Sequence, residues 1–187
     1  MGQLIYSMMV SLDGYVADQH GDFRWAVPDE EVLAMVNEQT ATVGTYLYGR
    51  RMYELMQVWE TDPHIAGDSP GSQEYATLWQ QATKIVYSQR LDEVATQRTT
   101  LRRNFDPAEV RQLKETSETN LTVDGPTLAA EAFRHDLIDQ IHAIVCPVMV
   151  GEGLAFLPNV RLELELLASQ QFGNGMVSLQ YQVNNSA

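Results

Sequence analysis

Hydrophobic and polar positions along this chain follow two patterns, which predict strands and helices in turn. Short runs rich in β-branched and aromatic residues, bounded by Gly, Asp or polar clusters, predict strands. Apolar residues spaced three and four positions apart predict helices. The predicted strands cover residues 4–12, 15–18, 45–49, 84–88, 99–103, 120–123 and 138–151. One predicted helix starts at Pro28, and the others cover residues 50–56, 73–82, 106–117 and 127–136.

The last part of the chain has a different pattern. Residues 160–172 and 176–183 alternate apolar and polar positions on either side of Gly-Asn-Gly, which predicts a β-hairpin. Alternating strands and helices followed by terminal strands predict an α/β domain, with a mixed, mostly parallel sheet flanked by helices and an antiparallel edge. No linker or repeat interrupts this pattern, so residues 1–187 are predicted to form a single domain. Residues 60–72, rich in Pro, Gly and Asp, are predicted to form an irregular loop and are a candidate lid.

Composition and charge narrow the function classes. The chain has 25 acidic and 12 basic side chains and a formal net charge of −13, which argues against nucleic acid and anionic membranes as partners. No basic segment precedes the first apolar run, and no run reaches ~20 apolar residues, so a cytosolic protein is predicted. The single cysteine, Cys146, lies in an apolar run and is predicted to be a buried thiol. The four His residues lack metal-ligand spacing, so no metal site is predicted.

Three strand-to-turn junctions are the candidate binding features of the sequence. They lie at residues 49–51, 88–90 and 124–127, each directly after or at the end of a predicted strand. In open α/β sheets ligands bind beyond the carboxyl ends of strands, where helix N-termini attract phosphate. Each junction alone is more simply explained as an ordinary turn. Together they favour an anionic dinucleotide, although neither a G-x-G-x-x-G nor a P-loop motif is present.

Five segments of the chain, taken in order, resemble the dihydrofolate reductase-like superfamily. They are SLDGYVAD, YLYGRRMYE, KIVYSQRL, LTVDGPTLAAEAFRHDLIDQ and CPVMVGEG. The nearest branch in this resemblance is the one shared with the reductase domain of bifunctional riboflavin-biosynthesis deaminase-reductases. The resemblance covers nearly the whole chain. It implies a single α/β domain with a mixed central sheet, NADPH as the hydride donor, and often a homodimer.

The resemblance gives the first junction a role in binding the pyrophosphate of NADPH. Gly49 and Arg50 match the Gly-Arg pair that opens the family's pyrophosphate-binding helix, and Arg51 follows in the same turn. Met52 stands where the family often has Thr, so one phosphate-facing hydroxyl is missing.

The second and third junctions are assigned in the same way. Ser88, Gln89 and Arg90 match the turn that reads the adenosine ribose and its extra phosphate, with Arg90 as the partner of the 2′-phosphate. Gly125 matches the second glycine of the family's Gly-Gly pair near the pyrophosphate, and Asp124 replaces the first. The remaining residues assigned to this cofactor turn are those that open the next helix, Pro126 and Thr127.

Two acidic positions are candidates for the chemistry. The segment WAVPDE resembles the W-x-x-P-x-[DE] pattern of bacterial dihydrofolate reductases, which places Trp25 and Pro28 beside the substrate-binding acid Glu30. In that role Glu30 would be partly buried, hold an N–C–N edge of the substrate and help deliver a proton. The alternative is that Glu30 is only an acid favoured at a helix N-terminus. Asp13 matches the acid of the family's SLDG segment and belongs either to the catalytic site or to a turn.

The leading hypothesis is therefore an NADPH-dependent reductase of a small heteroaromatic substrate, such as a pterin, a pyrimidine or a flavin precursor. The alternative is a non-catalytic nucleotide- or flavin-binding protein on the same fold, which the departures at Met52 and Asp124 favour. A homodimer is also predicted, because the terminal strands present more apolar edge than a monomer leaves uncovered.

Overall fold

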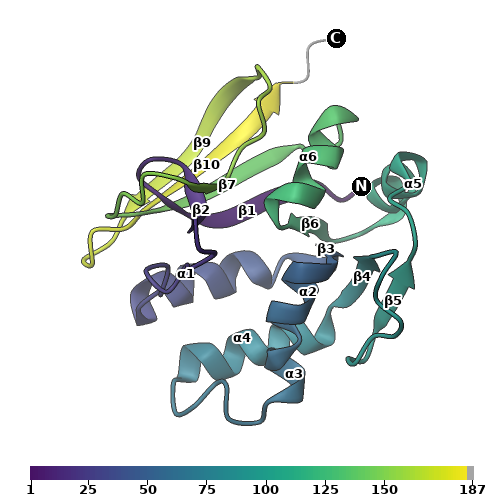
Figure 1. Cartoon of the computed structure of the whole chain (residues 1–187), viewed down its shortest axis with the longest axis horizontal. Coiled ribbons are helices and arrows are strands. Elements are labelled where there is room, and N and C mark those ends of the chain that lie inside the picture. The colour runs from purple at the N-terminus through teal and green to yellow at the C-terminus, as the bar shows by residue number, and fades with distance from the viewer. Residues whose placement is uncertain (185–187) are drawn as a thin grey trace.

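An eight-stranded sheet forms the centre of the computed structural model, which describes residues 1–184 (Figure 1). The strands lie in the order β5-β4-β3-β6-β1-β7-β10-β9, and β2 and β8 form a separate two-stranded sheet. The strands are β1 (Leu4–Ser11), β2 (Tyr15–Asp18), β3 (Val43–Gly49), β4 (Thr83–Tyr87), β5 (Thr99–Arg102), β6 (Asn120–Asp124), β7 (Gln140–Cys146), β8 (Gly153–Ala155), β9 (Glu163–Gln171) and β10 (Val177–Asn184). The helices are α1 (Glu30–Thr40), α2 (Arg50–Met56), α3 (Val58–Thr61), α4 (Pro70–Gln81), α5 (Pro107–Thr116) and α6 (Pro126–Arg134).

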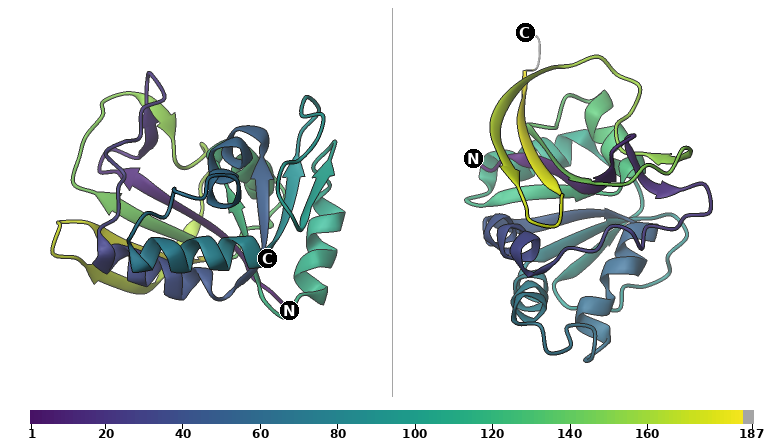
Figure 2. Two further views of the ribbon diagram at one scale, coloured as in Figure 1. Left: turned by 90° about the horizontal axis from the view of Figure 1, so that it is seen from below. Right: turned by 90° about the vertical axis from the view of Figure 1, so that its left-hand side faces the viewer.

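The direction of the strands confirms the predicted fold class. Strands β5, β4, β3, β6, β1 and β7 pair in parallel, whereas β10 pairs antiparallel with both β7 and β9. The hairpin β9–β10 is the one predicted around Gly-Asn-Gly. The sheet is therefore mixed and mostly parallel, with an antiparallel edge, as Figure 2 shows from two further sides.

Helices cover both faces of the sheet and divide the core into layers. Helices α5 and α6 bury their apolar residues against one face, where Val110 and Phe133 join the largest hydrophobic cluster. On the other face α1 packs beneath β7 and the turn between β9 and β10 through Val32 and Met35. The same face carries a cluster rich in aromatic residues, built from β3, α2 and α4, which includes the fully buried Trp79. Both faces of the parallel strands are thus buried, as parallel sheets require.

Several boundaries differ from the sequence prediction. Helix α1 has Asp29 as its N-cap, so Pro28 lies before the helix and not in its first turn. The predicted loop at 60–72 is shorter, because Ser69 caps a helix that starts at Pro70. The predicted strand at 138–151 ends at Cys146, which is buried as predicted. The pairing of β2 with β8 joins segments that are far apart in sequence, and local patterns carry no signal for it.

Candidate active site

The three candidate junctions lie next to one another at one edge of the sheet. They follow β3, β4 and β6, which are adjacent in the order β4-β3-β6 and parallel to each other. The carboxyl ends of parallel strands meet at the same edge, which is where open α/β sheets bind their ligands. The strand order therefore brings together residues that the sequence places in three separate segments.

The first and third junctions pack against each other at their two glycines. Gly125 has a φ of +96°, which favours glycine, and a Cβ built there would lie 3.4 Å from the Cβ of Met52. A Cβ on Gly49 would lie 3.9 Å from the Cβ of Leu128 in α6. Both glycines therefore let α2 and α6 approach each other closely at this edge, which we call the glycine edge. Met52 occupies the space beside Gly125, where the sequence predicted a missing hydroxyl.

Helix α6 starts directly after this glycine and borders a groove. Gly125 is its N-cap and Pro126 is in its first turn, while the Thr127 side chain is exposed. A groove with a volume of about 590 Å³ lies between these residues and Leu154 and Leu157 from the segment around β8. The free N–H groups of the first turn of α6 point to an anion at this end of the groove.

The two arginines of α2 differ in how free they are. Arg50 forms an ion pair with Glu54 one turn later, with an N–O distance of 3.1 Å. Both side chains are more than a third exposed, so the pair contributes little to stability and leaves Arg50 able to reorient. Arg51 is exposed at the same end of α2. Positive charge therefore lies beside the glycine edge, although only Arg51 is free of a carboxylate among the described residues.

The turn at 88–90 is held by hydrogen bonds that leave the Arg90 side chain exposed. The Oγ atom of buried Ser88 accepts the backbone N–H groups of Arg90 at 3.1 Å and Leu91 at 2.9 Å. Arg103, which no motif in the sequence indicated, also holds this turn in place. It donates to the carbonyl oxygens of Ser88 at 3.2 Å and Leu91 at 2.6 Å. Only the repeated Arg at the end of the weak strand 99–103 hinted at such a role.

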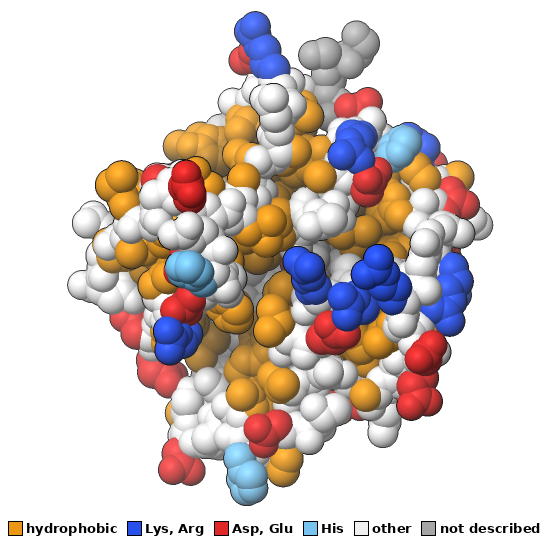
Figure 3. All heavy atoms as spheres, viewed as in Figure 1, with side chains coloured by type: hydrophobic (Ala, Val, Ile, Leu, Met, Phe, Trp, Pro, Cys, Tyr) orange, Lys and Arg blue, Asp and Glu red, His pale blue; other side chains and the backbone are white. Residues whose placement is uncertain are grey.

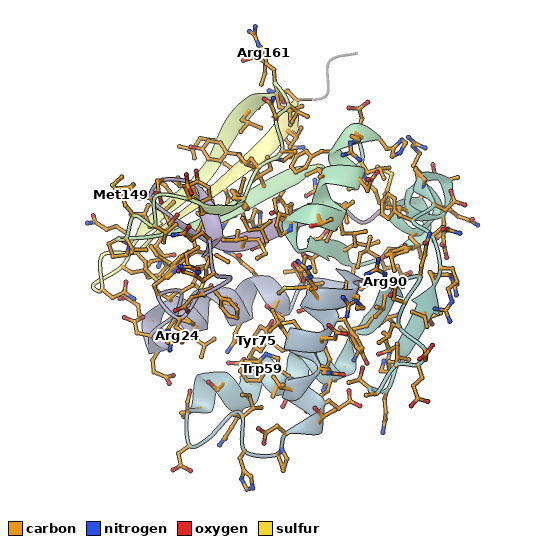
Figure 4. The ribbon with its side chains drawn as sticks, viewed as in Figure 1. Arg24, Trp59, Tyr75, Arg90, Met149 and Arg161 are labelled. Atoms are coloured by element: carbon orange, nitrogen blue, oxygen red, sulfur yellow. The ribbon has the colours of Figure 1, made fainter. Side chains whose placement is uncertain are left out.

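The neighbouring position Gln89 is also exposed, and its Nε2 atom donates to Asn104 Oδ1 at 3.0 Å. The turn is thus tied to the segment after β5. Figure 3 shows Lys and Arg side chains gathered near the middle of this face, beside a recess with hydrophobic walls. Figure 4 places Arg90 near the carboxyl end of β4, on the same side of the recess. A positively charged rim in a chain of net charge −13 is suited to an anionic ligand.

Asp124 ends β6, and its carboxyl group is turned into the protein. The residue is 8% exposed, and its Oδ1 atom accepts a hydrogen bond from Thr122 Oγ1 at 2.8 Å. The hydroxyl of Tyr48 on β3 is a second donor. Burial raises the pKa of Asp124 to about 7 despite these two donors. The carboxyl group therefore does not face the glycine edge, and at neutral pH it is only partly ionised.

Glu30 is exposed and lacks the partial burial that the substrate-binding role would require. It is the first residue of α1, and its Oε1 atom accepts a hydrogen bond from Ser69 Oγ at 2.6 Å. Ser69 is also the N-cap of α4, so this contact joins the starts of two helices. Trp25 is half-buried and packs against the cluster beneath β7, with its indole N–H donating to the Asp22 carbonyl at 3.3 Å. The surroundings of Glu30 are those of a helix-end acid.

We expect the variant Glu30→Gln to change the free energy of unfolding by about a few tenths of a kcal/mol, since glutamine keeps an acceptor for Ser69. Reduction of substrate should stay close to the wild-type rate, because an exposed acid at this position is not enclosed with the substrate. Denaturant unfolding and steady-state kinetics measure the two effects. A rate loss of at least ~100-fold with unchanged NADPH affinity would restore Glu30 as the acid of the site.

Asp13 braces two loops at the same edge of the sheet. Its carboxylate accepts hydrogen bonds from Ser11 Oγ at 2.6 Å and from the backbone N–H of Gly151 at 2.7 Å and of Val150 at 3.1 Å. The Ser11 hydroxyl and then the two backbone donors lower the pKa of Asp13. An acid held ionised in this way is a poor proton donor near neutral pH. Its contacts join the turn after β1 to the segment after β7.

Metal-binding groups and membrane-spanning helices are both absent from residues 1–184. No three His, Cys, Asp or Glu side chains in this range are grouped so that they could hold a metal ion. No helix in the same range has both the length and the hydropathy needed to cross a membrane.

His142, on β7, is buried and its pKa is lowered to about 4 by burial.

Comparison with known proteins places this geometry in a family. The family described as the RibD C-terminal domain matches residues 3–178. The uncharacterized protein YyaP of Bacillus subtilis (strain 168) is 25% identical over 187 residues, covering 97% of this chain and 95% of that protein. A putative riboflavin biosynthesis protein from Shewanella sp. PV-4 matches with a TM-score of 0.72 at 20% identity, covering 98% of this chain and 99% of that one.

Two further solved structures share the fold. The Thermotoga maritima diaminohydroxyphosphoribosylaminopyrimidine deaminase/5-amino-6-(5-phosphoribosylamino)uracil reductase matches with a TM-score of 0.65 at 16% identity. The match covers 98% of this chain but 57% of that longer protein. Dihydrofolate reductase from Enterococcus faecalis, solved with NADP(H), matches with a TM-score of 0.62 at 15% identity and 98% coverage of both chains.

Proposed function

This chain belongs to the RibD C-terminal domain family, and from that premise we propose that it is a cytosolic NADPH-dependent reductase of a small heteroaromatic substrate. The substrate class comprises pterins, pyrimidines and flavin precursors. The observation that supports the proposal most directly is the meeting of three glycine- and arginine-bearing turns at the carboxyl edge of β4, β3 and β6. A reductase-type fold among the relatives agrees with it.

The residues at this edge fit the parts of NADPH. The bare backbone at Gly49 and Gly125 suits the pyrophosphate, with the N-terminus of α6 beside it. Arg51 adds charge there, and Arg90 suits the 2′-phosphate, which distinguishes NADPH from NADH. When bound, NADPH supplies the hydride for the reduction. The buried Asp124 carboxyl does not oppose this assignment, because it faces away from the turn.

Thermal unfolding with NADPH, NADH and FMN in turn tests the proposal against the alternative of a non-catalytic binding protein. A ligand at about 100 times its dissociation constant adds about 2.7 kcal/mol of stability. We expect the largest rise in melting temperature with NADPH, together with oxidation of NADPH in the presence of 5-amino-6-(5-phosphoribosylamino)uracil or dihydrofolate. A shift with FMN alone, or with NADPH but no oxidation, would favour the binding protein.

We expect a homodimer in solution, formed through the edge strand β9. All nine residues of this strand are exposed, and the apolar members include Leu164, Leu166 and Leu167, which are 39%, 53% and 47% exposed. An apolar edge strand of this length is normally covered by another chain. Light scattering at micromolar concentration should give twice the chain mass of 21.0 kDa. Leu166→Glu should shift the mass to that of one chain and Gln170→Glu should not, whereas a monomeric wild type would contradict the expectation.

A further inference from the structure

Three acidic residues, Asp13, Glu30 and Asp124, are the candidates for a proton donor, and only Asp124 is buried. Glu30 is exposed and Asp13 is half-buried with three donors on its carboxylate, whereas Asp124 is 8% exposed. A proton donor for a reduction must hold a proton near neutral pH, and burial away from cations favours the protonated form of a carboxyl group. Of the three acids, Asp124 alone meets this condition.

The contacts of Asp124 orient its carboxyl group through hydroxyl donors and not through a cation. Thr122, two residues earlier on the same side of β6, donates to Oδ1 at 2.8 Å. Tyr48 accepts the indole N–H of Trp79 at 2.9 Å, so the proton of its own hydroxyl is available to Asp124. This chain of donors runs from α4 through β3 to β6. Thr122 and Tyr48 therefore orient the carboxyl group directly, and Trp79 orients Tyr48. All three side chains are buried.

The titratable groups near Asp124 are all tyrosines. Tyr46 and Tyr48 from β3 and Tyr75 from α4 lie on its own face of the sheet, whereas Tyr6 from β1 lies on the opposite face. Burial raises the pKa of each of these phenols, and the proximity of Asp124 raises it further. Within residues 1–184, no Lys, Arg or His side chain contributes to the pKa of Asp124. Its charge is thus not balanced by a cation.

Asp124 also occupies the right place in the fold. The next residue is Gly125, whose backbone forms the proposed cofactor edge, and consecutive Cα atoms are about 3.8 Å apart. On the side of the tyrosines, the half-buried Tyr75 packs edge-to-face on Trp59 with ring centroids 4.9 Å apart. Figure 4 shows this aromatic pair between α1, α2 and α4, where Figure 3 shows the hydrophobic recess. The acid therefore lies between the cofactor edge and the wall of an apolar recess.

From this placement we propose that Asp124 is the acid that supplies the proton for the reduction, to a substrate held in the recess beside Tyr75. The inference rests on the proposed reductase function. The proton from Asp124 binds the nitrogen or oxygen of a substrate C=N or C=O bond as the electron pair of that bond moves to the same atom. The carbon receives the hydride, NADPH is oxidised to NADP⁺, and the Asp124 carboxylate regains a proton from water. A substrate with a reducible C=N or C=O bond beside or within a flat ring fits this arrangement.

The protonation state of Asp124 can be measured without any turnover. Protein labelled with ¹³C at the aspartate carboxyl carbons is titrated by NMR, and the Asp124 signal is assigned by its loss in Asp124→Asn. We expect a midpoint near 7 and a higher midpoint in Thr122→Val, which removes a donor to the charged form. A midpoint at the ordinary value of an aspartate would overturn the proposal.

Single-turnover reduction of dihydrofolate and of 5-amino-6-(5-phosphoribosylamino)uracil by NADPH gives the kinetic test. The wild-type rate should fall as pH rises through the NMR midpoint, and the fall should move to higher pH in Thr122→Val. Asp124→Asn should lose at least ~100-fold in rate and its pH dependence while it keeps its NADPH affinity. The matched control is Asp136→Asn, an exposed turn residue beyond α6 with a φ of +53° that Asn tolerates, and it should resemble wild type.

The outcomes separate this inference from the function on which it rests. If the wild-type protein oxidises NADPH with neither probe, the proposed function itself is contradicted. If the wild type is active and Asp124→Asn keeps its rate and pH profile, only the role of Asp124 is overturned. Loss of NADPH affinity in Asp124→Asn would make it a cofactor-binding residue instead. Should Asp124→Asn fail to fold, an unchanged pH profile in Thr122→Val, despite a shifted NMR midpoint, would equally overturn the proposal.

Discussion

Replacing Arg90 by alanine should weaken the binding of NADPH by roughly 1–3 kcal/mol, about 5-fold to 150-fold, and leave the binding of NADH nearly unchanged. The guanidinium is exposed, and among the described residues no carboxylate pairs with it. Ser88 and Arg103 fix the turn on which it stands, so the side chain meets a 2′-phosphate with little reorganisation of the backbone. The cost is that of one charge-assisted interaction.

Fluorescence titration with both cofactors measures the selectivity directly. The matched control is Arg161→Ala. Arg161 is also exposed, but it lies just before β9 and far from Arg90 (Figure 4). This variant should bind both cofactors as the wild type does. Equal losses for NADPH and NADH in Arg90→Ala would remove Arg90 from the 2′-phosphate site and leave its charge as a general attraction for anions.

The free energy of unfolding should depend on pH in opposite ways through two buried groups, Asp124 and His142. The pKa of Asp124 is raised from 3.8 to about 7 in the folded protein, so between these values the folded state holds a proton that the unfolded state has lost. This contribution is fully present in acid and is lost as pH rises through about 7. At 1.36 kcal/mol per pKa unit, the loss is about 4 kcal/mol.

His142 acts in the reverse direction. Its pKa is lowered from 6.5 to about 4, so between these values the unfolded state binds a proton that the folded state excludes. This contribution is fully present above 6.5 and about 3 kcal/mol of it is lost as pH falls towards 4. The two contributions oppose each other over most of the acidic range, and the wild type should therefore vary less with pH than either variant.

Denaturant unfolding at a series of pH values separates the two groups. Relative to the wild type, Asp124→Asn should gain about 4 kcal/mol as pH rises from acid to above 7, because it has no proton to lose. His142→Gln should gain stability in acid in the same comparison. Parallel curves for wild type and Asp124→Asn would show that Asp124 titrates alike in the folded and unfolded chain, and would also remove the physical basis for its role as an acid.

Local patterns in the sequence determined the secondary structure closely. Pro107 after the N-cap Asp106, and Gly173 to Gly175 between alternating strands, are signals that act over a few residues, and the structure has α5 and the β9–β10 hairpin at those positions. The order of strands and helices also fixed the class of fold, because parallel strands need helical crossovers. The positions of the three candidate turns at strand ends follow from the same local signals.

The environment of the acids was decided by the tertiary structure alone. In the sequence Glu30 lies within a motif that suggests a pocket, yet in the fold it meets Ser69 at the surface. In the sequence, Asp124 stands where the resemblance implies the first glycine of a cofactor-binding turn, and its negative charge would oppose a phosphate there. It becomes a buried acid because β6 pairs beside β3, which brings Tyr48 to it, and because α4 packs on the same face with Trp79 and Tyr75.

The difference between the two kinds of result has a physical reason. Whether a residue lies on a helix, a strand or a turn depends on its neighbours in the chain, so the sequence by itself determined the elements and the residues at their ends. Whether a carboxyl group holds a proton depends on the solvent, hydrogen-bond donors and charges within a few ångströms of it. Those neighbours of Asp124 come from β3 and α4, and only the packing of distant segments brings them together.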